Sequence, residues 1–122
     1  GGKAMDGLYA AMTVQNPYLD DASQPIRFWA NKYKTAFNED PAVFSVYGYL
    51  VIDGFIRAAQ KAGPTLSTDT FIKAMDTMES PRDMFGSAPQ KFGPQKRLGS
   101  NLSRLSQLHD GRWTIVSNYI TE

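Results

Sequence analysis

The chain has 122 residues, of which 42% are hydrophobic and 20% are charged, a balance typical of an ordinary globular domain. The formal net charge of +1 argues against bulk electrostatic attraction to nucleic acid or to acidic lipid. There is no cysteine, which excludes disulfides, thiolate chemistry and cysteine-based zinc sites. No stretch approaches the ~20 consecutive apolar residues that a membrane-spanning helix needs.

The first third of the chain predicts a strand followed by a helix. Residues from Leu8 to Val14 alternate between two faces, as in a strand, and Asn16-Pro17 ends the run because proline cannot donate a ladder hydrogen bond. Ser23 is a suitable helix N-cap, and Pro25 is tolerated in the first turn. Apolar residues then recur at helical spacing and predict an amphipathic helix to about Phe37, namely Ile26, Trp29, Tyr33, Ala36 and Phe37.

Two further helices follow in the middle of the chain. The second is predicted from Ala42 or Val43 to Ala62, where Gly63-Pro64 ends it. Its apolar face is broad, so we expect it to be buried along most of its length, with Gly54 and Ala58 allowing close approach of a neighbour. The third helix begins at a cap, Ser67 or Thr68, and its expected inward residues are Phe71, Ile72, Met75 and Met78.

The last third predicts irregular structure and then a hairpin. Ser80 to Gln95 is rich in proline and glycine and can hold at most a short strand. Asp110-Gly111 suits the positive φ of a tight turn, so Leu102–Leu108 should pair with Trp113–Tyr119. The predicted fold class is α/β, with one strand, three helices and a C-terminal β-hairpin. A lone strand and hairpin cannot cover three amphipathic helices, so we expect self-association to complete the fold.

The residue types that carry catalysis do not assemble into a recognisable site. His109 is the only histidine and lies beside the predicted turn, where a solvent-exposed role is expected. The carboxylate pairs Asp20-Asp21 and Glu39-Asp40 lie at helix boundaries, where acidic side chains cap amides or face solvent. The sequence therefore predicts no enzyme, no metal and no cofactor.

A local excess of positive charge lies between Gly86 and His109, a stretch without acidic residues that contains Lys91, Lys96, Arg97 and Arg104. This segment is interpreted as a solvated loop, with an anion-facing patch as the alternative. A small nucleic-acid-binding domain that uses these four residues is a remote alternative, and no nucleic-acid partner is expected.

The best candidates for ligand contact are the aromatic residues Phe44, Tyr47 and Tyr49. They fall in the first turns of the second helix, just after a proline. Free amides at a helix N-terminus can hold an anion, and aromatic rings there can form the wall of an apolar pocket. Packing within the core is the alternative interpretation.

Four motifs in order resemble one family. The segment from Trp29 to Pro41 (WANKYKTAFNEDP) is similar to the "F..+Y...Fg..P" helix of Leu/Ile/Val-type substrate-binding proteins of ABC transporters, and the segment from Tyr47 to Gly63 resembles the next helix, which ends in "..A...AG". Thr70-Phe-Ile-Lys-Ala-Met is similar to the helix that follows. Leu98-Gly-Ser, Leu105-Ser-Gln-Leu and the run from Asp110 to Ser117 resemble the closing "q..dG.w..v" strands.

This resemblance implies that residues 1–122 are the C-terminal segment of a two-lobed protein of the type I periplasmic binding class about three times as long. The segment would contribute to both lobes, and the parent would be exported to the periplasm or the cell exterior. Its partners would be a small amino-acid-like or carboxylated ligand and an ABC permease. A ligand-sensing regulatory module of the same fold is the alternative function.

The resemblance also implies which residues face the cleft between the lobes. Only the loop and first turn after Pro41 would do so, namely Ala42, Phe44 and Tyr47. Several family members carry an aromatic residue where this chain has Ala42. A ligand larger than leucine, such as an aromatic or acyl carboxylate, would fit that difference.

Overall fold

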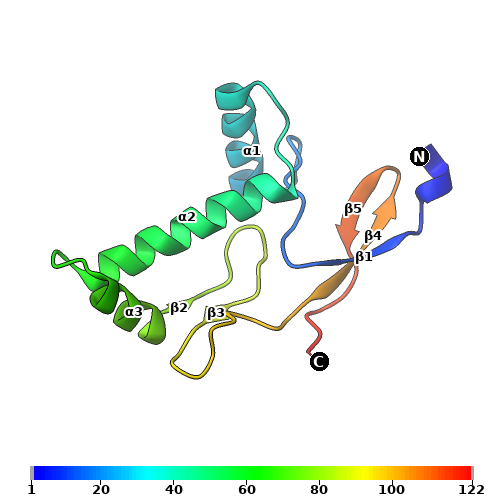
Figure 1. Ribbon diagram of the computed structural model, residues 1–122. Coiled ribbons are helices and arrows are strands. Elements are labelled where there is room, and N and C mark those ends of the chain that lie inside the picture. The colour runs from blue at the N-terminus through cyan, green and yellow to red at the C-terminus, as the bar shows by residue number, and fades with distance from the viewer. Residues whose placement is uncertain (1, 122) are drawn as a thin grey trace.

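The computed structural model describes residues 2–121, which form a helical part and a sheet part. The helical part contains α1 (Gln24–Phe37), α2 (Val43–Ala62) and α3 (Thr68–Thr77). The sheet part contains β1 (Tyr9–Met12), β4 (Arg104–His109) and β5 (Arg112–Ile115), and a short 3-10 helix (Gly2–Met5) precedes it. Extended segments connect the two parts, so the described chain crosses from the sheet to the helices and back (Figure 1). This architecture confirms the predicted α/β class and order of elements.

The helix boundaries follow the local signals in the sequence. Ser23 is the N-cap of α1, with proline in the first turn, and Asn38 ends that helix with a left-handed φ of 55°. Gly63 ends α2 at the predicted position, with a φ of 82°. Ser67 caps α3, where its side chain accepts a hydrogen bond from the Thr70 amide at 3.2 Å. Caps and stops of this kind act within a few residues, which is why the sequence predicts them well.

The sheet joins the first strand to the closing hairpin. β1 pairs antiparallel with β4, which pairs antiparallel with β5, in the order β1-β4-β5. Asp110 and Gly111 have φ values of 47° and 75°, which confirms the predicted tight turn. Both predicted hairpin strands and the predicted Leu8–Val14 strand are longer than the observed ones. The segment from Ser80 to Gln95, which we expected to hold at most one short strand, contains β3 (Gln90–Lys91) and the end of β2 (Glu79–Ser80), and these two strands pair with each other.

The core forms where the first strand's continuation meets the helices. Val14, Ile26, Val46 and Phe85 make a buried cluster. The Phe85 ring packs edge-on against Trp29 with ring centroids 5.0 Å apart. The backbone amide of Gln15 donates a hydrogen bond to the backbone carbonyl of Phe85 at 2.9 Å. Phe85 lies in the loop between β2 and β3, which the sequence did not identify as a source of core residues.

The prediction that α2 is buried along most of its length is wrong for the described chain. Val46 and Ala58 are its buried residues, whereas the side chain of Val51 is 69% exposed, with Ile52 and Phe55 also exposed. A Cβ added at Gly54 would meet no heavy atom within 4 Å, so no neighbour approaches closely there. The three-stranded sheet lies away from α2, and the element that packs against α2 is α3 (Figure 1). Ile72 and Phe37, which we expected to face inward, are likewise exposed.

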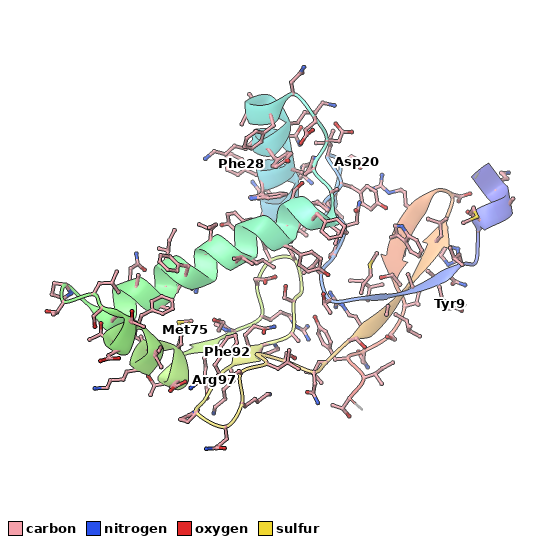
Figure 2. The ribbon with its side chains drawn as sticks, in the orientation of Figure 1. Tyr9, Asp20, Phe28, Met75, Phe92 and Arg97 are labelled. Carbon is pink, nitrogen blue, oxygen red and sulfur yellow. The ribbon has the colours of Figure 1, made fainter. Side chains whose placement is uncertain are left out.

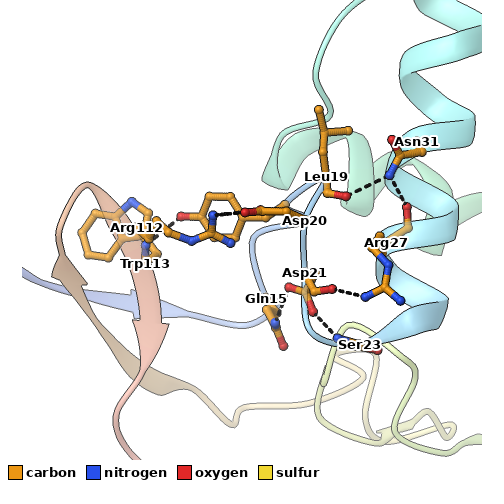
Figure 3. Close-up of polar contacts among 10 residues, drawn as sticks. Gln15, Leu19, Asp20, Asp21, Ser23, Arg27, Asn31, Arg112 and Trp113 are labelled. Atoms are coloured by element: carbon orange, nitrogen blue, oxygen red, sulfur yellow. Dashed lines mark hydrogen bonds and ion pairs between the residues drawn. The ribbon is translucent and has the colours of Figure 1, made fainter.

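A set of polar contacts fixes the sheet against the segment that precedes α1 (Figure 3). The Arg112 guanidinium donates to both carboxylate oxygens of Asp20, at 2.8 and 2.9 Å, and lies 4.1 Å above the Tyr18 ring. The Trp113 amide donates to the Tyr18 hydroxyl at 2.7 Å. Asp21 is buried and accepts from the Ser23 amide at 2.8 Å and from Gln15 at 3.0 Å. None of the helices within residues 2–121 combines the length and the hydrophobicity that a membrane-spanning helix requires.

Candidate functional site

The three predicted contact residues lie together at the start of α2. Ala42 is the N-cap, and its amide donates to the Ser45 hydroxyl at 3.1 Å. Phe44 is 83% exposed, and its ring lies edge-on to Tyr47 with ring centroids 6.0 Å apart. The geometry therefore brings Ala42, Phe44 and Tyr47 to one end of the helix. Because Phe44 is exposed, it is not packed in the core, which was the alternative interpretation of this residue.

Tyr47 connects this helix end to the segment that follows β1. Its hydroxyl forms a 2.6 Å hydrogen bond with the Thr13 hydroxyl. Both residues also line a groove of about 610 Å³ that runs along α2. The volume lies within the ~300–1,000 Å³ range of small-molecule sites. Tyr47 is therefore a wall residue of a groove that can accommodate a small organic molecule, whereas Ala42 and Phe44 lie outside its lining.

The groove is lined by both apolar and polar side chains. Met75 of α3 and Phe92 of the segment after β3 line it together with apolar residues of α2 (Figure 2). Its polar lining includes Thr13, Arg82 and Ser87. The sequence did not place the residues of the β2–β3 loop at a site. One local turn signal in this loop is Asp83, whose Oδ1 accepts hydrogen bonds from the Phe85 backbone amide at 2.8 Å and from the Ser87 backbone amide at 3.2 Å, as in an Asx-turn.

A second, more aromatic groove of about 460 Å³ lies between α1 and α2. Tyr49, the third aromatic residue of the predicted site, lines this groove rather than the first. Its ring packs edge-on against Trp29 with centroids 5.6 Å apart. Tyr49 and Tyr47 therefore line different grooves, and Tyr49 packs against α1.

The basic segment does not form a free patch. Lys91 pairs with Glu79 at 2.5 Å, and this contact raises the pKa of the lysine and lowers the pKa of the glutamate. Arg97 pairs with Asp76 at 2.5 Å. Arg104 is buried, with its guanidinium 4.8 Å from the centre of the Tyr119 ring. Two of the four basic residues are therefore paired with carboxylates, and a third, Arg104, is buried.

The remaining polar residues of the described chain make contacts within the fold and do not converge on a common site. His109 is exposed at the end of β4, with its Nε2 2.8 Å from Gln107 Oε1. Hydrogen bonding to Arg112 lowers the pKa of Asp20, and burial raises the pKa of Tyr119. Across the part of the chain that the structure describes, no group of three or more acidic or histidine side chains could hold a metal ion.

Comparison with solved structures identifies the fold. The chain superposes on a branched-chain amino acid ABC transporter protein from Thermus thermophilus with bound valine, with a TM-score of 0.74 and 18% identity over 99% of this chain and 35% of that one. A solute binding protein of an ABC transporter from Rhodopseudomonas palustris, in complex with 3,4-dihydroxybenzoic acid, gives a TM-score of 0.68 and 23% identity over 98% and 31% of the two chains. A fatty acid ABC transporter substrate-binding protein from Thermomonospora curvata gives a TM-score of 0.72 and 18% identity over 97% and 31%.

The chain thus spans about a third of the length of these solved structures. At such identities the likeness shows the fold alone. Among curated proteins, the comparison finds no match. The sequence profile of the family described as periplasmic binding protein matches residues 1–112, which is most of the chain. The chain therefore belongs to the periplasmic binding protein family.

Proposed function

We propose that the chain is part of the solute-binding component of an ABC importer, which binds a small organic solute and delivers it to a membrane permease without chemical change. The observation that carries this proposal is the family match over residues 1–112. Three structures of similar fold support it, since their names connect them to valine, to 3,4-dihydroxybenzoic acid and to fatty acid. These solutes are all carboxylic acids, so a carboxylated or amino-acid-like solute is the natural candidate. The parent would act outside the cytoplasm, in the periplasm or at the cell exterior.

The proposed place of the chain in the whole protein is its C-terminal segment, with a share in each of two lobes. The division of residues 2–121 into a helical part and a sheet part, connected by extended segments, supports this assignment (Figure 1). The chain would cross between the lobes near Gln15–Asn16 and again before β4. A solute held between the lobes would bias the equilibrium between open and closed forms through contacts with both.

Ala42, Phe44 and Tyr47 are the proposed solute contacts. Phe44 supports this role because it is a large apolar side chain in solvent at a helix N-terminus. Tyr47 supports this role because its hydroxyl forms a hydrogen bond with the hydroxyl of Thr13, which is on the segment that leaves the sheet. Tyr47 therefore lies beside the expected crossing between the lobes. The small Ala42 at the N-cap leaves room for an aromatic or acyl group next to the Phe44 ring.

Solute titration of the protein as its gene encodes it tests this function. Valine, 3,4-dihydroxybenzoate and octanoate are each titrated by calorimetry, and at least one is expected to bind. Phe44→Ala should weaken that binding about tenfold, as expected for an aromatic contact residue, with little effect on folding because the ring is exposed. Ile52→Ala, at another exposed apolar position of α2, is the matched control and should bind as the unmodified protein does.

Two results would contradict the proposal. If none of the three solutes binds, the carboxylated solute class is wrong. If a solute binds equally well to Phe44→Ala and to the unmodified protein, the start of α2 does not contact it. Loss of solute uptake in cells that lack the gene, and its restoration by the gene, would separate transport from binding alone.

A further inference from the structure

Arg104, the first residue of β4, is a buried cation without an anion. Its side chain is 8% exposed, and within residues 2–121 its Nε and Nη2 atoms are buried and have no hydrogen-bond partner. The N–H groups of these two atoms point to the same side of the planar guanidinium. A carboxylate matches that pair of donors in a bidentate hydrogen bond. The part of Arg104 that is left unsatisfied is therefore the part best suited to an organic acid.

The guanidinium is held in place by two neighbours. Its Nη2 atom lies 2.4 Å from the position that a Cβ would take at Gly86, so the group rests on a backbone that only glycine leaves open. The Tyr119 ring covers it at 4.8 Å, and the Tyr119 hydroxyl donates to the Gly86 carbonyl. A cation held against an aromatic face gains some stabilisation, but this leaves its N–H donors unpaired.

A second unpartnered polar group follows Gly86 in the chain. Ser87 is 7% exposed, its Oγ atom has no hydrogen-bond partner in the described residues, and it lines the groove along α2. The nearby Asp83 does not neutralise Arg104. Its Oδ1 accepts from two backbone amides, and no ion pair with Arg104 is formed. Buried donors and a buried charge of this kind are unfavourable unless they gain a partner.

We propose that Arg104 and Ser87 form a binding site for a carboxylate, with Arg104 Nε and Nη2 as the bidentate donors and the Ser87 hydroxyl as a third. Arg104 is buried, whereas Arg82, whose guanidinium lies 5.3 Å from the centre of the same Tyr119 ring, is exposed, and Asp83 is close in the sequence to Ser87. These charges suit a single negative charge better than the two charges of a phosphate. The unsatisfied nitrogen atoms are out of contact with solvent, so binding requires a shift of Tyr119 or of the Gly86–Ser87 turn. Of the two proposed donors Ser87 lines the groove and Arg104 does not, so the apolar part of the acid would reach the groove past Ser87.

This site is distinct from the proposed contacts at Ala42 and Phe44, which do not line the groove. The experiment uses the protein as its gene encodes it and measures calorimetric affinity for acetate, benzoate and octanoate, each beside its uncharged amide. At least one acid is expected to bind about thirtyfold more tightly than its amide, as for loss of a paired buried charge. Arg104→Met should reduce the affinity for the acid to that for the amide. Lys96→Met removes an exposed positive charge of the same segment and should leave both affinities unchanged.

Ser87→Ala keeps the test informative if Arg104→Met does not fold. It removes one neutral donor and should weaken binding of the acid about fivefold without changing binding of the amide. The inference is overturned if every acid binds no better than its amide, or if the acid binds Arg104→Met and Ser87→Ala as it binds the unmodified protein. It is also overturned if Arg104→Met lowers the melting temperature while no acid raises that of the unmodified protein, since the anion would then be a side chain of the protein itself. Solute binding that depends on Phe44 but not on Arg104 would leave the proposed function standing without this site.

Discussion

Gly86 shows how much one residue can decide in this fold. Its φ of 69° lies in the left-handed region, and the space over its Cα is filled by the Arg104 guanidinium. We expect Gly86→Ala to lower the free energy of unfolding by about 1–3 kcal/mol, because it adds backbone strain and displaces a packed side chain. Urea denaturation followed by circular dichroism measures the change.

Gly93→Ala is the matched control for that substitution. Gly93 lies in the same irregular segment, has no positive φ, and would place its Cβ more than 4 Å from other heavy atoms. Its effect should stay within about 0.5 kcal/mol of zero. Equal destabilisation by both substitutions would mean that the segment tolerates no added side chain, and that the contact with Arg104 has no special role.

Helices were predicted from the sequence more accurately than the site because their signals are local. Ser67 and Gly63 each mark a boundary through their own backbone and side chain, and Asp110-Gly111 marks the hairpin turn in the same way. The proximity of Phe44 and Tyr47 follows from helical spacing and was predicted as well. Phe85 was missed because its burial depends on Trp29, which is far away in the sequence, and no local pattern records that contact.

The lengths of the strands were overestimated for a similar reason. A strand extends only as far as it has a partner, and β1 is paired along one side, by β4. Beyond Met12 the chain leaves the sheet, and Val14 enters the core beside the helices instead. Alternation of apolar residues could not distinguish these two kinds of burial. The groove could not be predicted for the same reason, since its walls come from α2, α3 and several segments that are far apart in the sequence.

The contact between the sheet and the segment before α1 should depend on pH through Asp20. Its pKa is lowered by the hydrogen bond to Arg112, so the contribution of this carboxylate to stability is present above its unfolded pKa of about 3.9 and is lost as pH falls through the lower folded value. We expect Asp20→Asn to be less stable than the unmodified protein at pH 6, with the difference shrinking as pH falls below the unfolded pKa of the carboxyl group. Thermal unfolding across this range gives the comparison.

The carboxylate is exposed, so added salt should shrink the difference at pH 6 as well. Asp110→Asn is the control, because asparagine tolerates the left-handed φ of the hairpin turn and removes the same charge from a neighbouring region. A pH profile of Asp20→Asn that runs parallel to that of the unmodified protein would show that the ion pair contributes nothing to the joint between the two parts.

At the scale of the whole molecule, many large apolar side chains are exposed to solvent instead of being packed in the core. Val51 and Ile52 of α2 are more than half exposed, and Phe28 of α1 is 70% exposed (Figure 2). Both β1 and β5 have one edge without a partner strand in the described sheet. Contiguous apolar faces and open strand edges are the features by which one chain adheres to another.

The 122-residue chain by itself should therefore self-associate. Light scattering at high micromolar concentration is expected to give a dimer or a larger assembly, completed by contacts across the α2 face and the strand edges. Val51→Asp places a charge in the middle of the exposed α2 face and should shift the population toward monomer. Gln60→Glu adds the same charge at an exposed polar position of α2 and should leave the assembly unchanged. A compact monomer of the unmodified chain would show that the apolar face is stable in water without a partner.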